Sequence, residues 1–462
     1  PMQYKKLTIN DPSELLFGHA PQPVKTRRGL HIGGGIVYPE LNFTLPTIEV
    51  SKNNYDEVSE HYRDIVTRSL KRAVELSSQG VVLEFETVVE MTQVPEIGIE
   101  LIKEMNSICE DYFQKYHLPV EIRLTPNDLR EFENPPKQSS SKYLEPMMKL
   151  FEEGAKAGGD LLSIESTGGK EISDDALLMC DIRTFVFSQA VLGVRDMNFL
   201  WKKIVEIARK YNKIPAGDTA CGFGNTAMVL AEKMYIPRLF AAIARVATVV
   251  RSLVAFEAGA IGPDKDCAYE GPFLKAIAGI PISMEGRTAA CAHLSPLGNI
   301  TAACADLWSN ESVQNVQLLA GMAPTIYMEQ LEYDARLMNQ AIKQGKADIL
   351  KLQELNVNSD AFLDPQAFIL MPVNVIEISK SIVKGRNYVE ATKMGCIKAL
   401  SLIKQAYEDK QLRINEMELP WLSSLMDDLE SIPDTESAFI AEMVPTLEKN
   451  KVLFNEYNLD PL

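Results

Sequence analysis

The sequence has few of the residues that metal sites and nucleic-acid sites commonly use. Its 462 residues include only five histidines, and none of these forms a His-x-His or His-x-x-x-His pair. Lys and Arg number 47 against 63 Asp and Glu, which gives a formal net charge of -16. Because such a surface repels phosphate backbones and anionic lipid headgroups, we expect neither nucleic acid nor membrane as a partner.

Long uninterrupted apolar runs are also missing. The most apolar stretch, residues 239–260, is interrupted by Arg245, Arg251 and Glu257, which a membrane span tolerates poorly. The first residues lack the basic segment and apolar run of a secretion signal, so we expect a cytoplasmic protein. Seven cysteines, an odd number, then favour reduced thiols over a disulfide framework, and metal binding becomes the leading use for any accessible thiol.

Helical and strand-like segments alternate through the middle of the chain. Five helical segments are each followed by a short apolar run of strand character, and a last strand is expected near residues 282–284. The helix and strand pairs are 55–76 with 80–87, 99–116 with 120–124, 143–157 with 161–164, 198–211 with 214–218, and 237–251 with 253–257. This alternation predicts a parallel sheet, and the repeat number favours an α/β fold of the TIM (β/α)8 barrel type.

The two ends of the chain differ from this middle region. Residues 1–50 are rich in Pro and Gly without a clear period, which predicts an N-terminal arm wrapped over the barrel. The barrel is expected to span residues 51–330. Residues 331–462 show helical patterns with few strand signals, which predicts a helical C-terminal region.

Three residues with metal-binding side chains stand at or just beyond predicted strand ends. Cys221 lies in residues 217–227 (GDTACGFGNTA), where glycines on both sides leave the thiol open at a strand-to-helix turn. Cys267 lies in residues 266–272 (DCAYEGP) and Glu165 in 164–169 (IESTGG). Catalytic groups of such barrels gather at the carboxyl ends of the strands, so these three should converge on one rim. Two sulfurs and one carboxylate make a three-ligand zinc site.

Each of these residues also has a simpler interpretation. Cys221 could be a small apolar residue that packs a helix on the sheet, Cys267 a loop cysteine without a role, and Glu165 a cap for neighbouring amides. The other cysteines are interpreted as structural, and His293 is the one histidine placed near the rim. The structural cysteines are Cys109 and Cys396, on apolar helical stripes, and Cys180, Cys291 and Cys304.

The three motifs, together with residues 192–197 (LGVRDM), resemble the zinc-containing methanol:corrinoid methyltransferases of methanogens and acetogens over nearly the whole chain. The resemblance implies a TIM barrel with Zn²⁺ held by Glu165, Cys221 and Cys267. It implies a methyltransferase in which zinc-bound methanol gives its methyl group to a cob(I)amide cofactor, forming methyl-Co(III). That corrinoid (cobalamin) would be carried by a separate corrinoid-binding protein docked over the barrel mouth. A homodimeric core within a hetero-oligomer is also implied.

A zinc site of this kind needs help with the leaving group. Two thiolates and one carboxylate bring the dication to a formal charge of about -1, which weakens its Lewis acidity relative to histidine ligation. Hydroxide leaves poorly, so we expect a nearby acid to protonate the departing oxygen. The candidates are Asp218, at the strand end that leads to Cys221, and Glu84 or Glu86 on the predicted strand 80–87.

Other functions remain open from the sequence alone. The same chemistry could act on another small alcohol or a methoxy donor. A zinc-dependent barrel hydrolase would need a base and usually histidine-rich ligation, which the shortage of histidine disfavours. A scaffold that only assembles a complex is the third alternative. No Asp-x-His-x-x-Gly motif of the corrinoid-binding type is present, which fits a separate carrier subunit.

Overall fold

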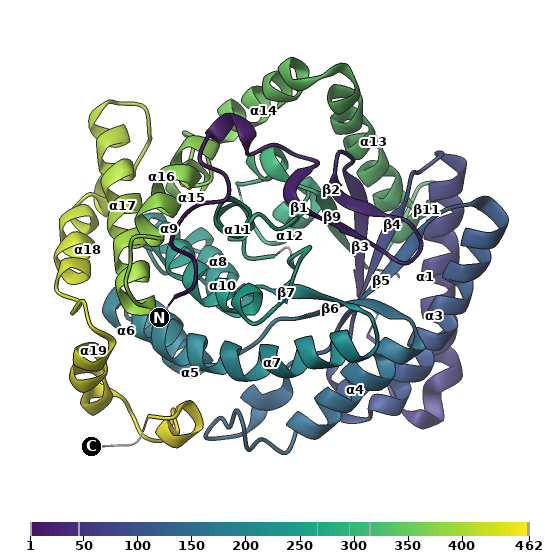
Figure 1. Ribbon diagram of the computed structural model, residues 1–462, viewed down its shortest axis with the longest axis horizontal. Coiled ribbons are helices and arrows are strands. Elements are labelled where there is room, and N and C mark those ends of the chain that lie inside the picture. Colours follow the sequence, from purple (N-terminus) through teal and green to yellow (C-terminus); the bar gives the residue numbers. More distant parts are fainter. Residues whose placement is uncertain (1, 45–46, 266, 295, 314–315, 460–462) are drawn as a thin grey trace.

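Seven parallel strands form the centre of the computed structural model, which describes residues 2–44, 47–265, 267–294, 296–313 and 316–459 (Figure 1). Their order in the sheet is β7-β6-β5-β4-β3-β9-β8. The strands are β3 (Tyr38–Thr44), β4 (Val81–Glu86), β5 (Val120–Thr125), β6 (Gly159–Ile164), β7 (Ile214–Asp218), β8 (Ser283–Glu285) and β9 (Leu307–Val313). Nearly every residue of β4, β5 and β6 is buried, as is typical of parallel strands that are covered on both faces.

Residues 261–264 lie between the two edge strands of the sheet, β7 and β8, and form hydrogen bonds with the segments on both sides. The Ile261 amide donates a hydrogen bond to the carbonyl of Pro215 on β7 at 2.9 Å, and Asp264 forms a parallel bridge with Ile282 beside β8. Gly217 permits this approach, because its φ is +149° and an added Cβ would lie 3.1 Å from the Asp264 Cα. The segment therefore stands where an eighth strand would be. The sheet closes as a TIM-barrel-like α/β fold, and the predicted fold class is confirmed.

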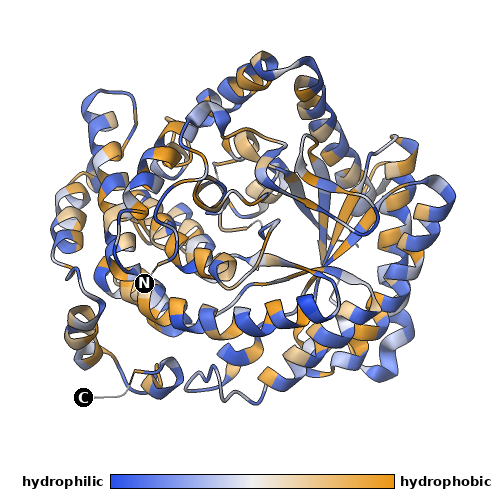
Figure 2. Cartoon of the chain, viewed as in Figure 1, coloured by the Kyte–Doolittle hydropathy of each residue, from blue (hydrophilic) through white to orange (hydrophobic). Residues whose placement is uncertain are grey.

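Helices form the outer layer, and their apolar faces lie toward the sheet (Figure 2). In α1, for example, Tyr62, Ile65, Val66 and Leu70 are buried at helical spacing. The main helices around the sheet are α1 (Tyr55–Glu75), α3 (Pro95–Tyr116), α4 (Leu144–Ala157), α7 (Val194–Lys210), α9 (Arg238–Ala247), α10 (Val249–Glu257), α11 (Gly271–Ala278) and α13 (Ala323–Gln344). Shorter helices follow the strands β4, β6, β7 and β8 in the chain: α2 (Val89–Gln93), α5 (Lys170–Leu178), α6 (Ile182–Phe187), α8 (Thr226–Glu232) and α12 (Arg287–Ala292).

Three strand predictions need correction. The predicted strand 253–257 is wrong, because these residues belong to α10, which is buried on nearly all sides and so shows no helical period. Two strands of the seven-stranded sheet were not predicted, β9 and β3. Strand β3 lies within residues 1–50, the segment interpreted as an arm, and pairs with both β4 and β9. Its Pro39 and its polar residues Glu40 and Asn42 obscure the apolar pattern of a buried strand.

The barrel interior changes from apolar to ionic along its axis. At the amino-terminal end, the hairpin of β1 (His19–Lys25) and β2 (His31–Gly34) inserts Leu30 and Ile32 into a small apolar cluster with residues of five barrel strands. In the next layer, the Arg123 guanidinium lies 2.9 Å from a carboxylate oxygen of Glu40 and donates to the Ser163 hydroxyl. Polar side chains therefore point into the barrel on the side where the strands end.

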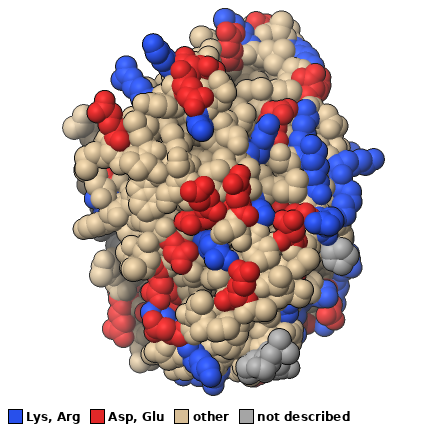
Figure 3. Space-filling view, turned by 90° about the vertical axis from the view of Figure 1, so that its left-hand side faces the viewer, with Lys and Arg blue, Asp and Glu red and all other residues tan. Residues whose placement is uncertain are grey.

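The C-terminal part of the described chain is helical. Its main helices are α14 (Lys346–Asp360), α15 (Pro365–Phe368), α16 (Pro372–Ile382), α17 (Tyr388–Glu408), α18 (Pro420–Glu430) and α19 (Glu436–Met443). The side of the molecule on which α17, α18 and α19 lie carries Asp and Glu across its centre (Figures 1 and 3). Among the described residues one helical stretch, Arg238–Glu257, is long and apolar enough to span a membrane, and all of it is buried inside the fold, as in a core helix.

Candidate metal centre

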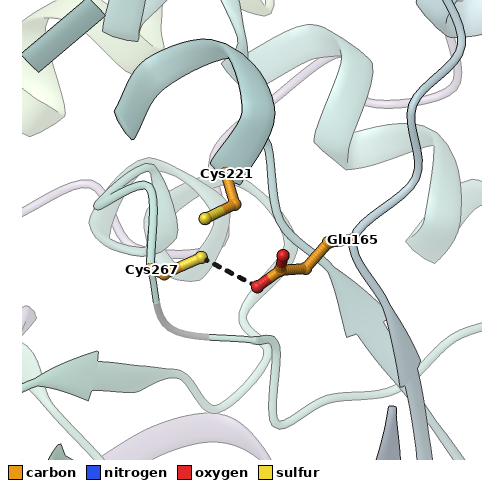
Figure 4. A group of neighbouring side chains, drawn as sticks. All are labelled: Glu165, Cys221 and Cys267. Carbon is orange, nitrogen blue, oxygen red and sulfur yellow. Dashed lines mark hydrogen bonds between the residues drawn. The ribbon is translucent and has the colours of Figure 1, made fainter. Parts of the chain in front are cut away.

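Glu165, Cys221 and Cys267 come together at the carboxyl end of the barrel (Figure 4). Glu165 follows β6, Cys221 begins the π-helix Cys221–Asn225 after β7, and Cys267 lies in the segment between α10 and α11. One donor atom from each residue lies within 4.8 Å of the other two. The Cys267 thiol donates a hydrogen bond to Glu165 Oε1 at 3.3 Å. Three segments far apart in the sequence therefore aim their metal-binding atoms at one point, as we expected.

The backbone at Cys221 has a form that is common at functional sites. A single π-helical turn occupies residues 221–225 and leads directly into α8. Cys221 is partly exposed, whereas Cys267 is 2% exposed and so is not an exposed loop cysteine. The four other cysteines whose side chains are described stand outside the cluster: Cys109, Cys180, Cys304 and Cys396. Cys291 lies outside the described side chains.

Asp218 connects the loop of Glu165 to the loop of Cys221. Its Oδ1 accepts hydrogen bonds from the amides of Ser166 at 3.1 Å and Thr219 at 2.8 Å. Its Oδ2 accepts one from the Trp201 indole at 2.9 Å. The side chain is fully buried, and burial raises its pKa. These bonds use both oxygens inside the protein and favour a bracing role for Asp218 over proton donation.

A second buried carboxylate connects the loops of Cys221 and Cys267. Glu270 accepts hydrogen bonds from the Ala220 amide at 2.8 Å and from the Ser252 hydroxyl at 3.0 Å. The Thr219 hydroxyl accepts one from the Ala268 amide at 3.1 Å. Ser166, Ala220 and Ala268, each adjacent to a candidate ligand, are thus held by a neighbouring loop. A site built this way is pre-organised, because the ligand positions do not depend on a bound ion.

The donor set fits a zinc ion. Tetrahedral bonds of about 2.3 Å to sulfur and about 2.1 Å to oxygen place the two atoms about 3.6 Å apart, close to the 3.3 Å between Cys267 Sγ and Glu165 Oε1. A hydrogen bond with Cys267 lowers the pKa of the Cys221 thiol, but burial and the Glu165 carboxylate outweigh it and raise this pKa to about 12. Burial, the hydrogen bond with Cys221 and its charge raise the pKa of Cys267 well above its ordinary value. The two thiols therefore need a nearby dication to become thiolates.

Lys265 is a site residue that sequence reasoning missed. Its ammonium lies 3.3 Å from Glu165 Oε1 and forms an ion pair with Glu84, and its side chain is only 1% exposed. Burial raises the pKa of Glu165, but Lys265 and hydrogen bonds with Cys267 and Glu86 outweigh it, so the net shift is downward. The one signal in the sequence is the position of Lys265, two residues before Cys267.

The two carboxylates of β4 differ in their surroundings. Glu84 is fully buried and lies between Lys265 and Arg123, whose Nε is 3.5 Å from a Glu84 oxygen. Glu86 lies one layer nearer the rim, is 24% exposed, and accepts a hydrogen bond from Asn42 at 3.2 Å. Burial and the Glu165 carboxylate raise the pKa of Glu86 to about 8. Of the three proton-donor candidates, Glu86 alone combines contact with the ligand set and a proton available near neutral pH.

His293 does lie near the rim, in a second cluster beside the first. Its Nε2 is 3.3 Å from Glu285 Oε1 and 3.6 Å from Glu311 Oε2. Hydrogen bonds to these two carboxylates raise the pKa of His293 to about 11, so the imidazolium itself offsets part of their negative charge. Asn225 links the clusters, because its Nδ2 lies 3.5 Å from Cys221 Sγ and 3.4 Å from His293 Nδ1.

Comparisons with known proteins identify the family of the chain. The family model of the methanol-cobalamin methyltransferase B subunit matches residues 2–460. A methanol–corrinoid protein co-methyltransferase from Methanosarcina barkeri is 35% identical over 460 residues, which are 99% of this chain and 98% of that protein. The crystal structure of the methanol:cobalamin methyltransferase complex MtaBC from Methanosarcina barkeri contains a chain that matches with a TM-score of 0.94 and 34% identity, covering 99% of this chain and 100% of that one. The chain therefore belongs to the methanol-cobalamin methyltransferase B subunit family, whose members are methyltransferases that work with a corrinoid protein.

Proposed function

We propose that the chain transfers the methyl group of methanol to a cob(I)amide carried by a separate corrinoid protein, using zinc held by Glu165, Cys221 and Cys267. The observation that carries the proposal is the convergence of these three donors at the carboxyl end of the barrel in a member of this family. When bound, zinc supplies a Lewis acid that polarises the C–O bond of the alcohol. Three protein ligands leave a fourth position for that oxygen.

The surrounding residues hold and protonate the reacting groups. Glu86 gives its proton to the departing oxygen, so that the C–O electron pair leaves with water rather than with hydroxide. The two electrons of the new bond to carbon come from cobalt(I), which becomes cobalt(III). Asp218 and Glu270 keep the ligand loops in register through their bonds to Ser166, Thr219 and Ala220. Displacement of a zinc-binding side chain would slow methyl transfer without changing the reaction.

The partner would dock over the rim of the barrel. Cobalt must reach the methyl carbon, and water must be kept from a cobalt(I) nucleophile, so the corrinoid protein has to cover the strand ends directly. Three loops there carry exposed apolar residues: Phe132 after β5, Leu294 after β8 and Leu319 after β9 are 55%, 46% and 109% exposed. Exposed apolar side chains around a site entrance support such an interface.

Methanol is the donor that the relatives' names support, since both name methanol. Another small alcohol or a methoxy compound would use the same residues and is the second candidate. A zinc hydrolase is disfavoured, because two thiolates and a carboxylate make a weaker water-activating site than neutral histidines do. A cytoplasmic location and a homodimeric core complete the proposal.

Metal analysis of the wild type beside Cys221→Ala tests the proposal. Each protein is assayed for zinc, and methyl-cobalamin formation from methanol and reduced cobalamin is followed by absorbance. One zinc per chain in the wild type, with zinc and activity lost together in Cys221→Ala, is the expected result. Full activity in a zinc-free variant would overturn the role of the metal, and activity with other donors but not methanol would favour the second candidate.

A further inference from the structure

Lys265 is a buried cation within a group of carboxylates. Its ammonium contacts Glu165 Oε1 at 3.3 Å, forms an ion pair with Glu84, and lies 3.9 Å from Glu86 Oε1. Only 1% of its side chain is exposed. Burying an ammonium group is costly and is tolerated only where paired charges compensate for it. The position of Lys265 beside a candidate metal ligand therefore needs an explanation.

Neutralising Glu84 accounts for the charge of Lys265 but not for its contact with Glu165. The Arg123 guanidinium, also fully buried, already lies 3.5 Å from Glu84 and 2.9 Å from Glu40. Arg123 and Lys265 together balance Glu40 and Glu84, one positive charge for each negative charge. The contact between Lys265 and Glu165 comes in addition to this balance. This contact connects the ionic layer inside the barrel, formed by Glu40, Glu84, Arg123 and Lys265, to the candidate metal centre.

We propose that Lys265 is a positioning residue that makes the metal position more electrophilic. This inference rests on the proposed zinc site. The ammonium holds Glu165 in place and draws electron density from its carboxylate, so that this oxygen donates less to the cation. It also adds positive potential at the open coordination position, where negative charge develops on the oxygen as the C–O bond breaks. Lys265 thereby offsets part of the negative charge that two thiolates and a carboxylate bring to the ion.

The charge of Lys265 can be measured without turnover. In a cobalt(II)-substituted chain, thiocyanate binding to the open position is followed by the visible absorption bands of the cobalt. The test variant is Lys265→Met with Glu84→Gln, which removes one cation and one anion together and leaves no uncompensated buried charge. We expect thiocyanate to bind on the order of 100-fold more weakly than to the wild type. With zinc, kcat should fall while the KM for methanol changes little.

Two further variants separate charge from packing. Lys265→Arg keeps the positive charge and should keep most of the thiocyanate affinity. Lys275→Met with Asp306→Asn is the matched control, because it removes another fully buried lysine and carboxylate pair, 3.0 Å apart and on the amino-terminal side of the barrel. This control should leave the thiocyanate affinity unchanged. A similar loss in the control would overturn the inference.

Unchanged thiocyanate affinity in a folded, metal-loaded Lys265→Met, Glu84→Gln chain would also overturn it. If that double variant does not fold, Glu84→Gln alone decides. It removes the other carboxylate that pairs with the Lys265 ammonium, so the ammonium can interact more strongly with Glu165. The affinity should then rise several-fold, and no rise counts against the inference. Failure of the wild type to bind zinc or cobalt(II) at all would instead refute the proposed function.

Discussion

Asp218→Asn distinguishes a bracing carboxylate from a proton donor. An asparagine keeps one acceptor oxygen, so if that oxygen faces the amides of Ser166 and Thr219, its NH₂ group faces the Trp201 indole, donor against donor. A buried indole N–H left without a partner costs about 1–3 kcal/mol, and the two remaining bonds lose their charge assistance. Removal of a buried charge offsets part of this loss. We therefore expect the variant to be less stable by about 2 kcal/mol.

The larger effect should be on zinc. Ser166 follows Glu165 directly and Thr219 lies two residues before Cys221, so weaker bonds to Asp218 loosen two ligand loops at once. Loss of a bracing residue of this kind weakens metal affinity by about 10–100-fold. Competition with a chromophoric chelator measures the zinc affinity, and calorimetry measures the melting temperature, which should fall by about 2 °C for a chain of this length.

Trp201→Phe is the matched control for this experiment. It removes the indole donor and keeps the aromatic packing, so Asp218 retains both backbone bonds that position the ligand loops. Stability should fall by about 1 kcal/mol, with zinc affinity within a few-fold of the wild type. The reasoning is refuted if Asp218→Asn binds zinc normally and loses methyl transfer, since Asp218 would then act on the reacting oxygen.

Three further predictions concern single side chains. Glu86→Gln should keep full zinc content and lose at least about 100-fold in methyl transfer, and unchanged turnover would exclude Glu86 as the donor. Burial raises the pKa of Glu332 on α13 to about 7. Its stabilising contribution is therefore complete below pH 4.5, and the free energy of unfolding falls by up to about 3 kcal/mol as the pH rises through 7. Glu332→Gln should remove this pH dependence, which melting temperatures measured from pH 4 to 8 would show. Leu319→Asp should weaken binding of the corrinoid protein in a titration and leave zinc content unchanged, whereas Tyr116→Asp, at the opposite end of the barrel, should leave both binding and zinc content unchanged.

Glu165 and Cys221 could be proposed as ligands from the sequence because each stands at or just beyond the end of a strand, β6 and β7. Cys267 lies between α10 and α11, and its expected place depended on the incorrect strand 253–257. Strand ends gather at one edge of a parallel barrel, so residue type and position are enough to place Glu165 and Cys221 together. Lys265 was not found in this way, and Glu86 was named from the sequence but could not be distinguished from Glu84 and Asp218. What makes them site residues is their distance to side chains on other strands, which depends on how the barrel closes.

The strands that the sequence analysis missed have a physical reason in common. Strand β3 points Glu40 and Asn42 into the barrel, where they contact Arg123 and Glu84. Polar residues at inward positions remove the apolar alternation by which a buried strand is recognised. Residues 253–257 show the opposite case, because α10 is apolar on nearly every side and its buried Arg251 donates to the carbonyl of Ser166. Strands that carry polar residues into the barrel interior are therefore harder to recognise from the sequence.

The ionic layer of Glu40, Glu84, Arg123 and Lys265 also bears on the position of Glu86, the proposed proton donor. Arg123 and Lys265 balance Glu40 and Glu84 within the barrel. Above them, Glu165 and two thiolates around a bound zinc ion would leave a formal charge of about -1. Burial raises the pKa of Glu86 and the negative charge of Glu165 raises it further, to about 8, so Glu86 keeps its proton at a pH where most glutamates have lost theirs. In the proposed site, the negative charge that weakens the Lewis acid would also favour the protonated form of Glu86, and the two effects would oppose each other at the departing oxygen.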